Sequence, residues 1–260
     1  MKKNNSRLPA ERQQRILDIL RGEFTVRSSR LSELMRVSEM TIRRDLDTLE
    51  KQGLIERTHG GAVSRQERVA GKFRYSASAD ENLVEKQNIA KRAAAMIEPH
   101  DTIYIGEGVT TAHVVRYAEP GMPFTIFTNN LGVLSEMTDS AAELILLAGT
   151  YNPGTHALAG PLTMEMIRQV NASKVFLGVD GLSLSAGLTT PNLDIAVIER
   201  SMIRHTRGRI IAMADHQKFG LVAEISVVPL KNIDVLITDR EIPSEFRQDL
   251  ESMGVQIVIA

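Results

Sequence analysis

A basic segment near the start of the chain carries side chains that can bind a polyanion. Arg43 and Arg44 stand side by side in VSEMTIRRDL (37–46), where only Ile42 separates them from Met40 and Thr41. A guanidinium group can make two hydrogen bonds to a guanine edge or pair with a phosphate, and threonine can reach a phosphate or a thymine methyl. An isolated Arg-Arg pair is more often just a solvated helix face. The interpretation therefore depends on the elements that surround the pair.

Charge is divided unevenly along the 260 residues, although the net charge is only −1. Residues 1–72 hold 16 Lys and Arg against 10 Asp and Glu, which gives +6, and the remainder holds 15 against 22, which gives −7. A basic head on an acidic body favours a polyanionic partner for the head and a different role for the body.

Three short helices are expected in the head, because apolar residues recur there at helical spacing. They cover residues 9–21, 28–36 and 39–52. Ser28 or Ser29 is the expected N-cap of the second helix, and Ser38 that of the third.

Two further short strands are expected in LIERTHGGAV (54–63), which has Gly60 and Gly61 at its turn, and a β-prone piece covers 24–26. This order predicts a winged helix-turn-helix over residues 9–64, with the helix-turn-helix itself at about 26–45. The third helix would present its N-terminal end to the major groove of DNA. The expected DNA-contacting residues are Ser38, Met40, Thr41, Arg43, Arg44, Arg57 and His59.

The rest of the chain predicts a second domain of the α/β class. A polar linker is expected at 65–83 and the second domain at 84–260. Seven apolar strand candidates alternate with helical stretches there, which is typical of a mostly parallel sheet covered on both faces. The candidates are 102–106, 124–129, 143–149, 174–181, 209–215, 234–239 and 255–260.

Polar and glycine-rich segments follow several of these strands. In parallel sheets ligands bind beyond the carboxyl ends of the strands. Each segment alone is more often a turn or a helix cap, but several at one sheet edge favour a pocket. The segments are 106–111, 128–130, 149–150, 180–181, 187–190 and 215–218.

Several classes of site are excluded or disfavoured. The chain has no Cys, which excludes disulfides, Cys-based metal sites and thiol catalysis. Its six His show no metal-binding spacing, and we expect neither a metal nor a cofactor. The first twenty residues lack the apolar core of a signal peptide, and the longest apolar runs are too short to span a membrane, so we expect a cytoplasmic protein.

The motif VSEMTIRRDLDTLEKQGLIERTHGGAV (37–63) resembles the DNA-binding domain of the DeoR/GlpR family of transcriptional regulators. Later segments are similar to that family's sensor domain in the same order: TNNLGV, LLAGTYNPGTHALAGP, ASKVFLGVDGLSLSAGLTT, ADHQKFG and LITD. The resemblance implies a sensor fold similar to ribose-5-phosphate isomerases and CoA transferases. It also implies double-stranded DNA and a phosphorylated sugar or polyol as partners, and a homo-oligomer.

The same resemblance implies which residues line the effector pocket. They are Gly108, Thr110, Thr111, Asn129, Gly149, Gly181 and Lys218, together with Gly106 and Glu107 of the same loop. Lys218 is the expected countercharge for a phosphate or carboxylate. Where the family usually shows Asp-Ser-Gly-Ser/Thr-Thr, this chain has GEGVT (106–110), so an acid enters the loop. Glu107 would repel a phosphate or accept hydrogen bonds from sugar hydroxyls.

The function that these observations predict is a ligand-controlled regulator, a repressor of a carbohydrate or polyol catabolic operon without enzymatic activity. The alternative is a sugar-phosphate isomerase-like enzyme, since Asp215 and Lys218 are residue types that such enzymes use. A complete winged helix favours the regulator, because an isomerase has no need of one. Activation rather than repression stays open.

Overall fold

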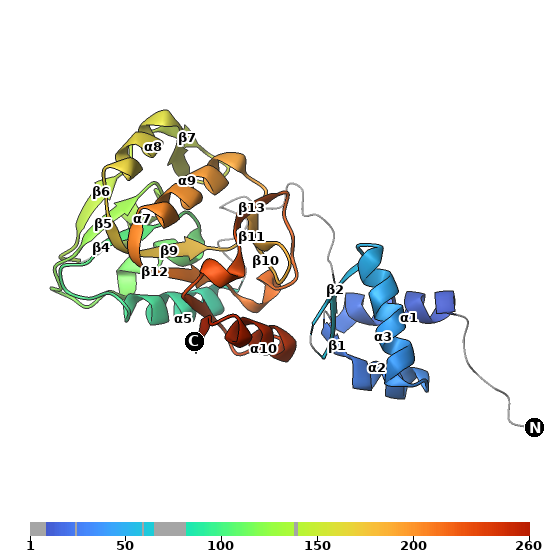
Figure 1. Ribbon diagram of the computed structural model, residues 1–260. Helices are drawn as coiled ribbons and strands as arrows, with labels where there is room; N and C mark the ends of the chain where they lie inside the picture. Colours follow the sequence, from blue (N-terminus) through green and yellow to red (C-terminus); the bar gives the residue numbers. More distant parts are fainter. Residues whose placement is uncertain (1–8, 24, 59, 65–81, 138–139) are drawn as a thin grey trace, which may run out of the picture.

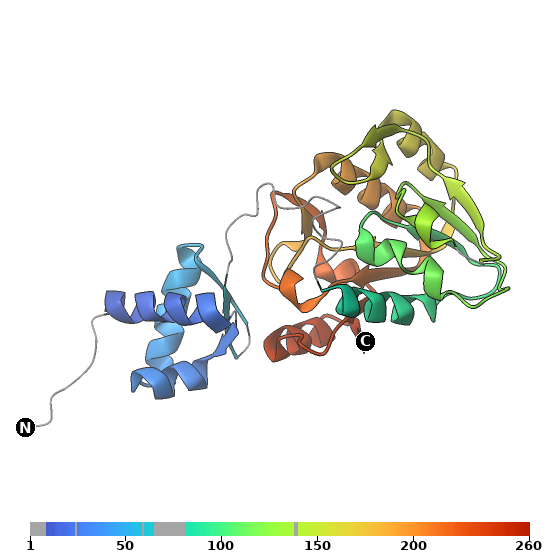
Figure 2. The same ribbon diagram turned by 180° about the vertical axis from the view of Figure 1, so that it is seen from behind.

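The computed structural model describes residues 9–23, 25–58, 60–64, 82–137 and 140–260. They form two bodies, an N-terminal domain up to Ser64 and a C-terminal domain from Asn82 (Figure 1, and from behind in Figure 2). The expected fold class is confirmed: a helix-turn-helix domain precedes an α/β domain built on a seven-stranded parallel sheet. The expected linker, 65–83, lies almost wholly outside the described residues.

The N-terminal domain packs three helices against a small sheet. Its elements are α1 (Pro9–Glu23), β1 (Thr25–Arg27), α2 (Ser28–Met35), α3 (Glu39–Lys51), β2 (Ile55–Arg57) and β3 (Gly61–Ser64). Strand β3 lies between β1 and β2 and is antiparallel to both. The β-prone piece before α2 is thereby joined to the wing, the hairpin formed by β2 and β3.

One face of each helix builds the core of this domain. The apolar residues at helical spacing are at most 1% exposed: Ile16, Leu20, Leu31, Ile42, Leu46 and Leu49. Burying side chains of this size contributes roughly 1.5–3 kcal/mol each relative to leaving them in water. The spacing therefore fixes which face of α3 turns inward and which faces solvent.

The start of α2 differs from the expectation. Arg27 occupies the N-cap position without a side-chain cap, and Ser28 is the first helical residue. The expected cap at Ser28 or Ser29 was wrong, because β1 runs directly into α2. The Ser28 backbone N–H instead donates to the carbonyl of Gly60 in the wing, at 2.9 Å.

The C-terminal domain is organised around the seven parallel strands. They are β4 (Thr102–Ile105), β5 (Thr125–Thr128), β6 (Glu143–Leu146), β9 (Ala172–Gly178), β12 (Thr206–Met213), β14 (Val235–Thr238) and β15 (Gln256–Ile259). Their order in the sheet is β15-β14-β12-β9-β4-β5-β6, and every neighbouring pair is parallel. The chain leaves β4 in one direction along the sheet and β9 in the other, so a topological switch point lies between these two strands.

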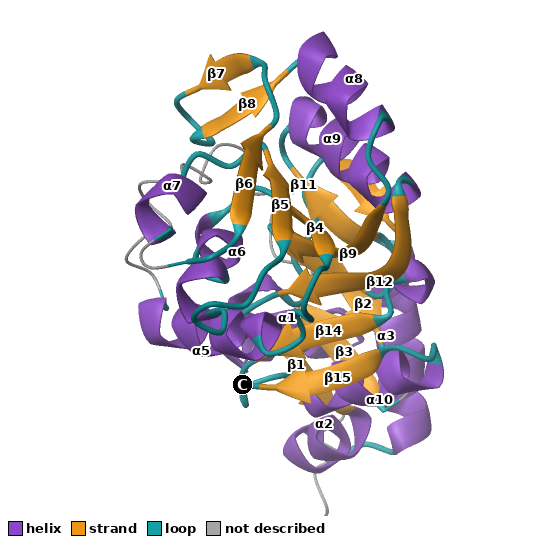
Figure 3. Ribbon diagram, turned by 90° about the vertical axis from the view of Figure 1, so that its left-hand side faces the viewer, coloured by secondary structure: helices purple, strands orange, loops and turns teal. Residues whose placement is uncertain are grey.

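Helices cover both faces of this sheet, as Figure 3 shows. On one face, Ile103 and Ile105 of β4 pack against α5 (Leu83–Ala94), α6 (Val109–Ala112) and α7 (Val133–Glu136). On the other face, Tyr104 packs against α8 (Pro161–Arg168) and α9 (Leu193–Arg204). The α10 helix (Ser244–Ser252) covers that second face farther along the sheet. The side chains of alternate residues of β4 thus pack into two separate hydrophobic cores, one on each face of the sheet.

Two smaller sheets were not expected from the sequence. One is a hairpin of β7 (Thr150–Asn152) and β8 (Ala157–Ala159). The other is antiparallel and joins β10 (Gly181–Ser183), β11 (Gly187–Thr190) and β13 (Ile225–Val228). Residues 187–190 are therefore a strand rather than the loop we expected, because their backbone groups pair with both neighbouring strands.

Short 3-10 turns complete the domain: η1 (Val115–Tyr117), η2 (His216–Lys218) and η3 (Leu230–Asn232). Hydrogen bonds and an ion pair join the two domains within the described residues. Arg27 Nε lies 3.1 Å from the Glu245 carboxylate of α10, which sits beside the N-terminal domain in both Figures 1 and 2. Glu56 of β2 accepts a hydrogen bond from the Ser183 hydroxyl at 2.7 Å.

Candidate nucleic-acid interface and ligand pocket

The exposed end of α3 is shaped by a capping serine. Ser38 lies just before the helix in an extended conformation, and its hydroxyl accepts a hydrogen bond from the Thr41 backbone N–H at 3.2 Å. The Thr41 hydroxyl lies 2.9 Å from that of Ser38. The predicted cap at Ser38 is therefore confirmed. Two hydroxyls and the positive end of the helix dipole meet where a phosphate would approach.

Three of the expected contact residues face solvent on this helix. Met40 is 59% exposed, and Arg43 and Arg44 are both exposed. Arg43 Nη2 lies 3.9 Å from the exposed Glu39 carboxylate, a surface ion pair that contributes little. The two guanidinium groups can therefore reorient toward a nucleic acid with little loss of free energy.

Arg57 of the wing turns toward α3. Its guanidinium donates to the backbone carbonyl of Arg43 at 3.3 Å and lies 3.4 Å from the Asp47 carboxylate. Its backbone N–H donates to the Glu50 carboxylate at 3.1 Å. Arg57 thus ties the wing to α3, and its contact with DNA stays a prediction. His59 lies outside the described residues.

The acid of the TIRRDL segment faces inward. Asp45 forms a two-pronged ion pair with Arg12 of α1: Nη2 donates to Oδ1 at 2.9 Å and Nε to Oδ2 at 2.5 Å. The side chains of Arg12 and Asp45 are 8% and 5% exposed. The hydrogen bonds to Asp45 raise the pKa of the Arg12 guanidinium. The pair fixes the angle at which α3 leaves the core.

A pocket lies at the switch point of the parallel sheet, beyond the carboxyl ends of β4 and β9. This is where ligands bind in open α/β sheets. Its lining residues come from both loops, from α5, α9 and η2, and from the small antiparallel sheet. They are Lys86, Glu107, Gly108, Val109, Thr110, Gly178, Val179, Asp180, Leu188, Thr189, Thr190, Ile195, Glu199, Lys218 and Val227.

The pocket has a volume of about 70 Å³. A water molecule takes up about 30 Å³ of liquid, so this space matches only two or three waters. Pockets for drug-sized ligands usually measure roughly 300–1,000 Å³. A ligand larger than a few atoms would therefore extend out of this space or displace part of the wall.

Three acids stand in or against this pocket. Burial raises the pKa of Glu107 well above its ordinary value, and the charges of Glu199 and Asp180 raise it further. Burial raises the pKa of Glu199 in the same way, and the charge of Asp180 adds to it. Glu107 Oε2 is buried without a hydrogen-bond partner among the described residues. A buried acceptor of this kind is suited to a ligand hydroxyl.

Two lysines and a threonine balance these acids in part. Lys86 is 4% exposed, and Lys218 lies in η2 on the other side of the pocket. Burial raises the pKa of Asp180, while a hydrogen bond from the Thr190 hydroxyl, at 2.7 Å, and the charge of Lys218 lower it. The pocket thus offers ammonium donors for an anion beside carboxyl groups that can bind hydroxyls.

Comparison with known proteins agrees with both sites. Residues 12–68 match the model of the DeoR-like helix-turn-helix domain, and residues 81–240 match that of the DeoR C terminal sensor domain. The chain belongs to the DeoR family. As a member of that family it is a DNA-binding transcriptional regulator, in which the N-terminal domain is the helix-turn-helix domain and the C-terminal domain is the sensor.

The relatives of this DeoR-family regulator span its whole length. The HTH-type transcriptional regulator GlpR of Haloferax volcanii is 34% identical over 96% of this chain and 98% of its own. The HTH-type transcriptional regulator GolR of Listeria innocua is 30% identical over 97% and 99%. The transcriptional repressor AccR of Agrobacterium fabrum is 32% identical over 88% and 89%.

Solved structures match the sensor domain more distantly. A ribose 5-phosphate isomerase A from Methanocaldococcus jannaschii has a TM-score of 0.40 at 14% identity, covering 54% of this chain and 55% of its own. The eIF2B beta of Chaetomium thermophilum has a TM-score of 0.43 at 16% identity, covering 60% and 49%. The helices in the described part of the chain are too short or too polar to cross a membrane.

Four of the nine residues expected to bind the effector of this DeoR-family regulator line the pocket: Glu107, Gly108, Thr110 and Lys218. Two others, Gly106 and Thr111, do not line the pocket but form hydrogen bonds within the loop that does. Gly106 is buried, and its carbonyl accepts the Thr111 hydroxyl at 2.9 Å. Thr111 is fully buried and also bonds the carbonyl of Gly108 at 3.0 Å.

The remaining three, Asn129, Gly149 and Gly181, do not line the pocket and instead contact neighbouring segments of the chain. The Asn129 side chain donates to the Leu158 carbonyl at 2.9 Å, beside β8. A Cβ on Gly149 would meet the Ala159 carbonyl at 2.6 Å. A Cβ on Gly181 would meet the Leu221 carbonyl at 2.7 Å. Both glycines are needed where two backbones come close, so neither lines this pocket.

Five charged or polar residues of the pocket were not among the expected set. Asp180, Thr189 and Thr190 stand in segments that the sequence singled out as polar, and each could have been found there. Lys86 and Glu199 stand inside helices, where a charged residue is normally solvated. No local signal distinguished them, since their burial follows from the strand order of the sheet.

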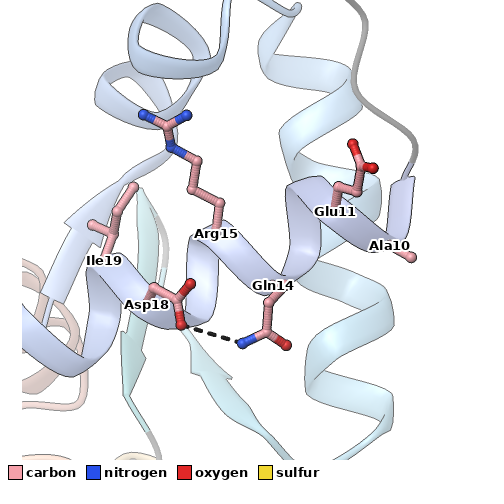
Figure 4. A pocket seen from close by; sticks show the side chains of 6 residues that line it. All are labelled: Ala10, Glu11, Gln14, Arg15, Asp18 and Ile19. Carbon is pink, nitrogen blue, oxygen red and sulfur yellow. Dashed lines mark hydrogen bonds between the residues drawn. The ribbon is translucent and has the colours of Figure 1, made fainter.

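A second hollow lies on the outer face of α1. Figure 4 shows its lining residues Ala10, Glu11, Gln14, Arg15, Asp18 and Ile19, all from this one helix. Gln14 donates to Asp18 at 3.2 Å. A hollow lined by a single helix cannot surround a ligand, so the pocket of the sensor domain is the better ligand site.

Proposed function

We propose that this regulator represses a carbohydrate or polyol catabolic operon and is released from DNA by a phosphorylated sugar or a related polyol metabolite. The observation that carries the proposal is the pocket at the switch point, where Lys86 and Lys218 accompany Glu107, Asp180 and Glu199. The lysines suit a phosphate or carboxylate, and the acids suit several hydroxyls. A phosphorylated polyol carries both kinds of group.

We propose that Ser38, Met40, Thr41, Arg43, Arg44, Arg57 and His59 contact the operator. The exposure of Met40 and of both arginines at the start of α3 supports this set. We further propose that the protein binds paired half-sites as a homo-oligomer, because one such domain buries only roughly 600–1,000 Å² on DNA. A DNA-binding protein of this kind would act in the cytoplasm.

We also propose that the pocket binds its ligand without turnover, since the relatives are named as regulators. Incubation of the full-length protein with ribose 5-phosphate and other aldose phosphates tests this. Formation of the ketose above the level of a Lys218→Ala control would favour the isomerase-like alternative instead.

The test of the effector class is a thermal-shift screen of the full-length protein against sugar and polyol phosphates and their unphosphorylated forms. A ligand that binds the folded state stabilises it by about 2.7 kcal/mol at a hundredfold excess over its Kd. We expect a phosphorylated compound to raise the Tm of the sensor domain and to release the protein from DNA. Stabilisation by the unphosphorylated forms alone would contradict the proposed class.

Glu107→Gln separates two modes of binding within this class. If a phosphate lies beside Glu107, the variant should bind more tightly at a pH at which Glu107 is ionised, because a repulsion between charges is removed. If Glu107 holds hydroxyls, the variant should bind more weakly, because an amide accepts less strongly than a carboxylate. The same compound, titrated into both proteins, decides between them.

A further inference from the structure

The wing is docked on the sensor domain through a buried carboxylate. Glu56 of β2 is only 4% exposed. It accepts hydrogen bonds from the Ser183 hydroxyl at 2.7 Å and from the Ser185 backbone N–H at 2.6 Å. A buried carboxylate is unfavourable unless such partners hold it, so this contact is sensitive to small displacements of its donors.

The hairpin that holds Glu56 is also a wall of the ligand pocket. Strands β10 and β11 form this hairpin, and Leu188, Thr189 and Thr190 of β11 line the pocket. Asp180 precedes β10 directly and binds the Thr190 hydroxyl at the base of the hairpin. Ser183 lies three residues beyond Asp180, which is about 10 Å along an extended strand.

The hairpin is cross-linked at its tip and at its base, and it is joined to β13. At its tip the Ser183 hydroxyl accepts from the Ala186 N–H at 3.2 Å, and the Ser226 hydroxyl of β13 donates to the Ala186 carbonyl at 3.2 Å. At its base the Thr189 hydroxyl donates to the Gly181 carbonyl at 3.2 Å. A shift at the base is therefore carried to the tip rather than absorbed between them.

The small size of the pocket suggests how a ligand could act on this wall. Its volume of about 70 Å³ is well below the roughly 300–1,000 Å³ of pockets for drug-sized ligands, so we expect a sugar phosphate to press against the hairpin. At the other end, β2 is tied to the DNA-reading helix, since Arg57 follows Glu56 and its guanidinium binds the Arg43 carbonyl at 3.3 Å. The chain of contacts runs from the pocket through the hairpin and Glu56 to α3.

We propose that Glu56 is a positioning residue that couples the ligand pocket to the recognition helix α3 through the β10–β11 hairpin. A ligand that displaces the hairpin changes the position of its two donors, and with it the orientation of the wing and α3. The inference rests on the proposed function in one respect, namely that the pocket binds an effector. A second contact joins the domains away from the pocket, where Arg27 donates to Glu245 and to the Ser244 hydroxyl.

Coupling is reciprocal, so it can be tested with DNA before any effector is known. The probe is a DNA duplex selected from a random pool by the full-length wild-type protein. Hydrogen exchange of backbone amides in 181–190 is measured with and without this duplex. Because allosteric coupling is typically at least about fivefold, we expect the duplex to change these exchange rates by about fivefold or more in the wild type.

Glu56→Ala and Ser183→Ala should each reduce this change in exchange rate to less than about twofold, since each removes a hydrogen bond between the wing and the β10–β11 hairpin. Hydrogen exchange in β4 and β9 checks that the sensor domain of each variant is folded. Binding of each variant to the DNA duplex checks that its N-terminal domain is folded. Glu33→Ala is the matched control, because Glu33 is an exposed glutamate of α2 in the same domain. It should keep the full effect of DNA.

Two results would overturn the proposal. One is a wild-type hairpin whose exchange does not respond to DNA. The other is a response of full size in both Glu56→Ala and Ser183→Ala. The experiment contains no effector, so a failed screen for sugar phosphates would contradict the proposed function without affecting this outcome.

Discussion

Replacing Asp45 by alanine should unfold much of the DNA-binding domain and leave the sensor domain intact. The carboxylate and its partner Arg12 are 5% and 8% exposed at their side chains, and two hydrogen bonds join them. Removing one partner of a buried pair costs about 3–5 kcal/mol, because the other charge stays buried and unpaired. A domain of residues 9–64 is expected to have a total stability of roughly 3–8 kcal/mol at 0.05–0.15 kcal/mol per residue. The loss is therefore comparable to the whole stability of the domain.

The chain itself offers a way to follow the two domains separately. It has no Trp, and its four Tyr (75, 104, 117 and 151) all lie beyond Ser64. In urea, tyrosine fluorescence reports the sensor domain, while far-UV circular dichroism reports the helices of both domains. Asp45→Ala should move the dichroism transition of the N-terminal domain to lower urea concentration and leave the fluorescence transition of the sensor domain unchanged.

Asp47→Ala is the control for this experiment, since the Asp47 side chain is 56% exposed. It should change stability by about 1 kcal/mol or less. The double variant Arg12→Met with Asp45→Leu should recover most of the loss, because a well-packed apolar pair can replace a buried ion pair. An Asp45→Ala protein with the same transitions as Asp47→Ala would refute the reasoning.

The other predictions concern function and pH. Arg43→Ala and Arg44→Ala should each weaken operator binding. If the arginine contacts a base, the loss should be about 1–3 kcal/mol and specificity at that position should relax; if it contacts a phosphate, binding should weaken on all sequences and depend less steeply on salt. Anisotropy titrations in which both variants bind as the wild type would contradict the assignment. Lys218→Ala should weaken binding of an anionic effector by roughly 1.5–3 kcal/mol and leave effector-free operator binding intact. Sedimentation of the protein–DNA complex should show more than one protomer per operator. Burial raises the pKa of Glu199 in the folded chain, so the folded state keeps a proton that the unfolded chain loses. Stability of the sensor domain should then fall as pH rises from about 4, with Glu199 contributing up to about 1.4 kcal/mol per pH unit. Glu199→Gln should make this fall shallower without removing it, because burial also raises the pKa values of Glu107 and Asp180.

Much of the fold could be predicted because its signals are local. Ile42, Leu46 and Leu49 at helical spacing indicated which face of α3 is buried, and that in turn placed Arg43 and Arg44 on the surface. The seven parallel strands are continuous apolar runs, since both of their faces are covered by helices. Patterns of this kind depend on neighbours within a few residues.

The pocket depended on information that is not local. Strand order decides that the loops after β4 and β9 adjoin, and nothing in either loop encodes that order. Lys86 and Glu199 reach the pocket from helices on opposite faces of the sheet for the same reason. Gly149 and Gly181 are glycines required for close backbone contact, which in a sequence look the same as glycines required for a ligand.

The acids of the pocket and its small volume together explain how a small metabolite could control a domain that it does not touch. A ligand shifts a conformational equilibrium only by the difference between its affinities for the two states. Glu107 has a buried oxygen without a partner among the described residues, so the closed pocket is unfavourable for that group, and a ligand hydroxyl would correct this only after the wall has moved. In the proposed coupling, the gain on binding is tied to a displacement of the β10–β11 hairpin. The tip of that hairpin donates two hydrogen bonds to Glu56, so the same displacement would change the orientation of the wing.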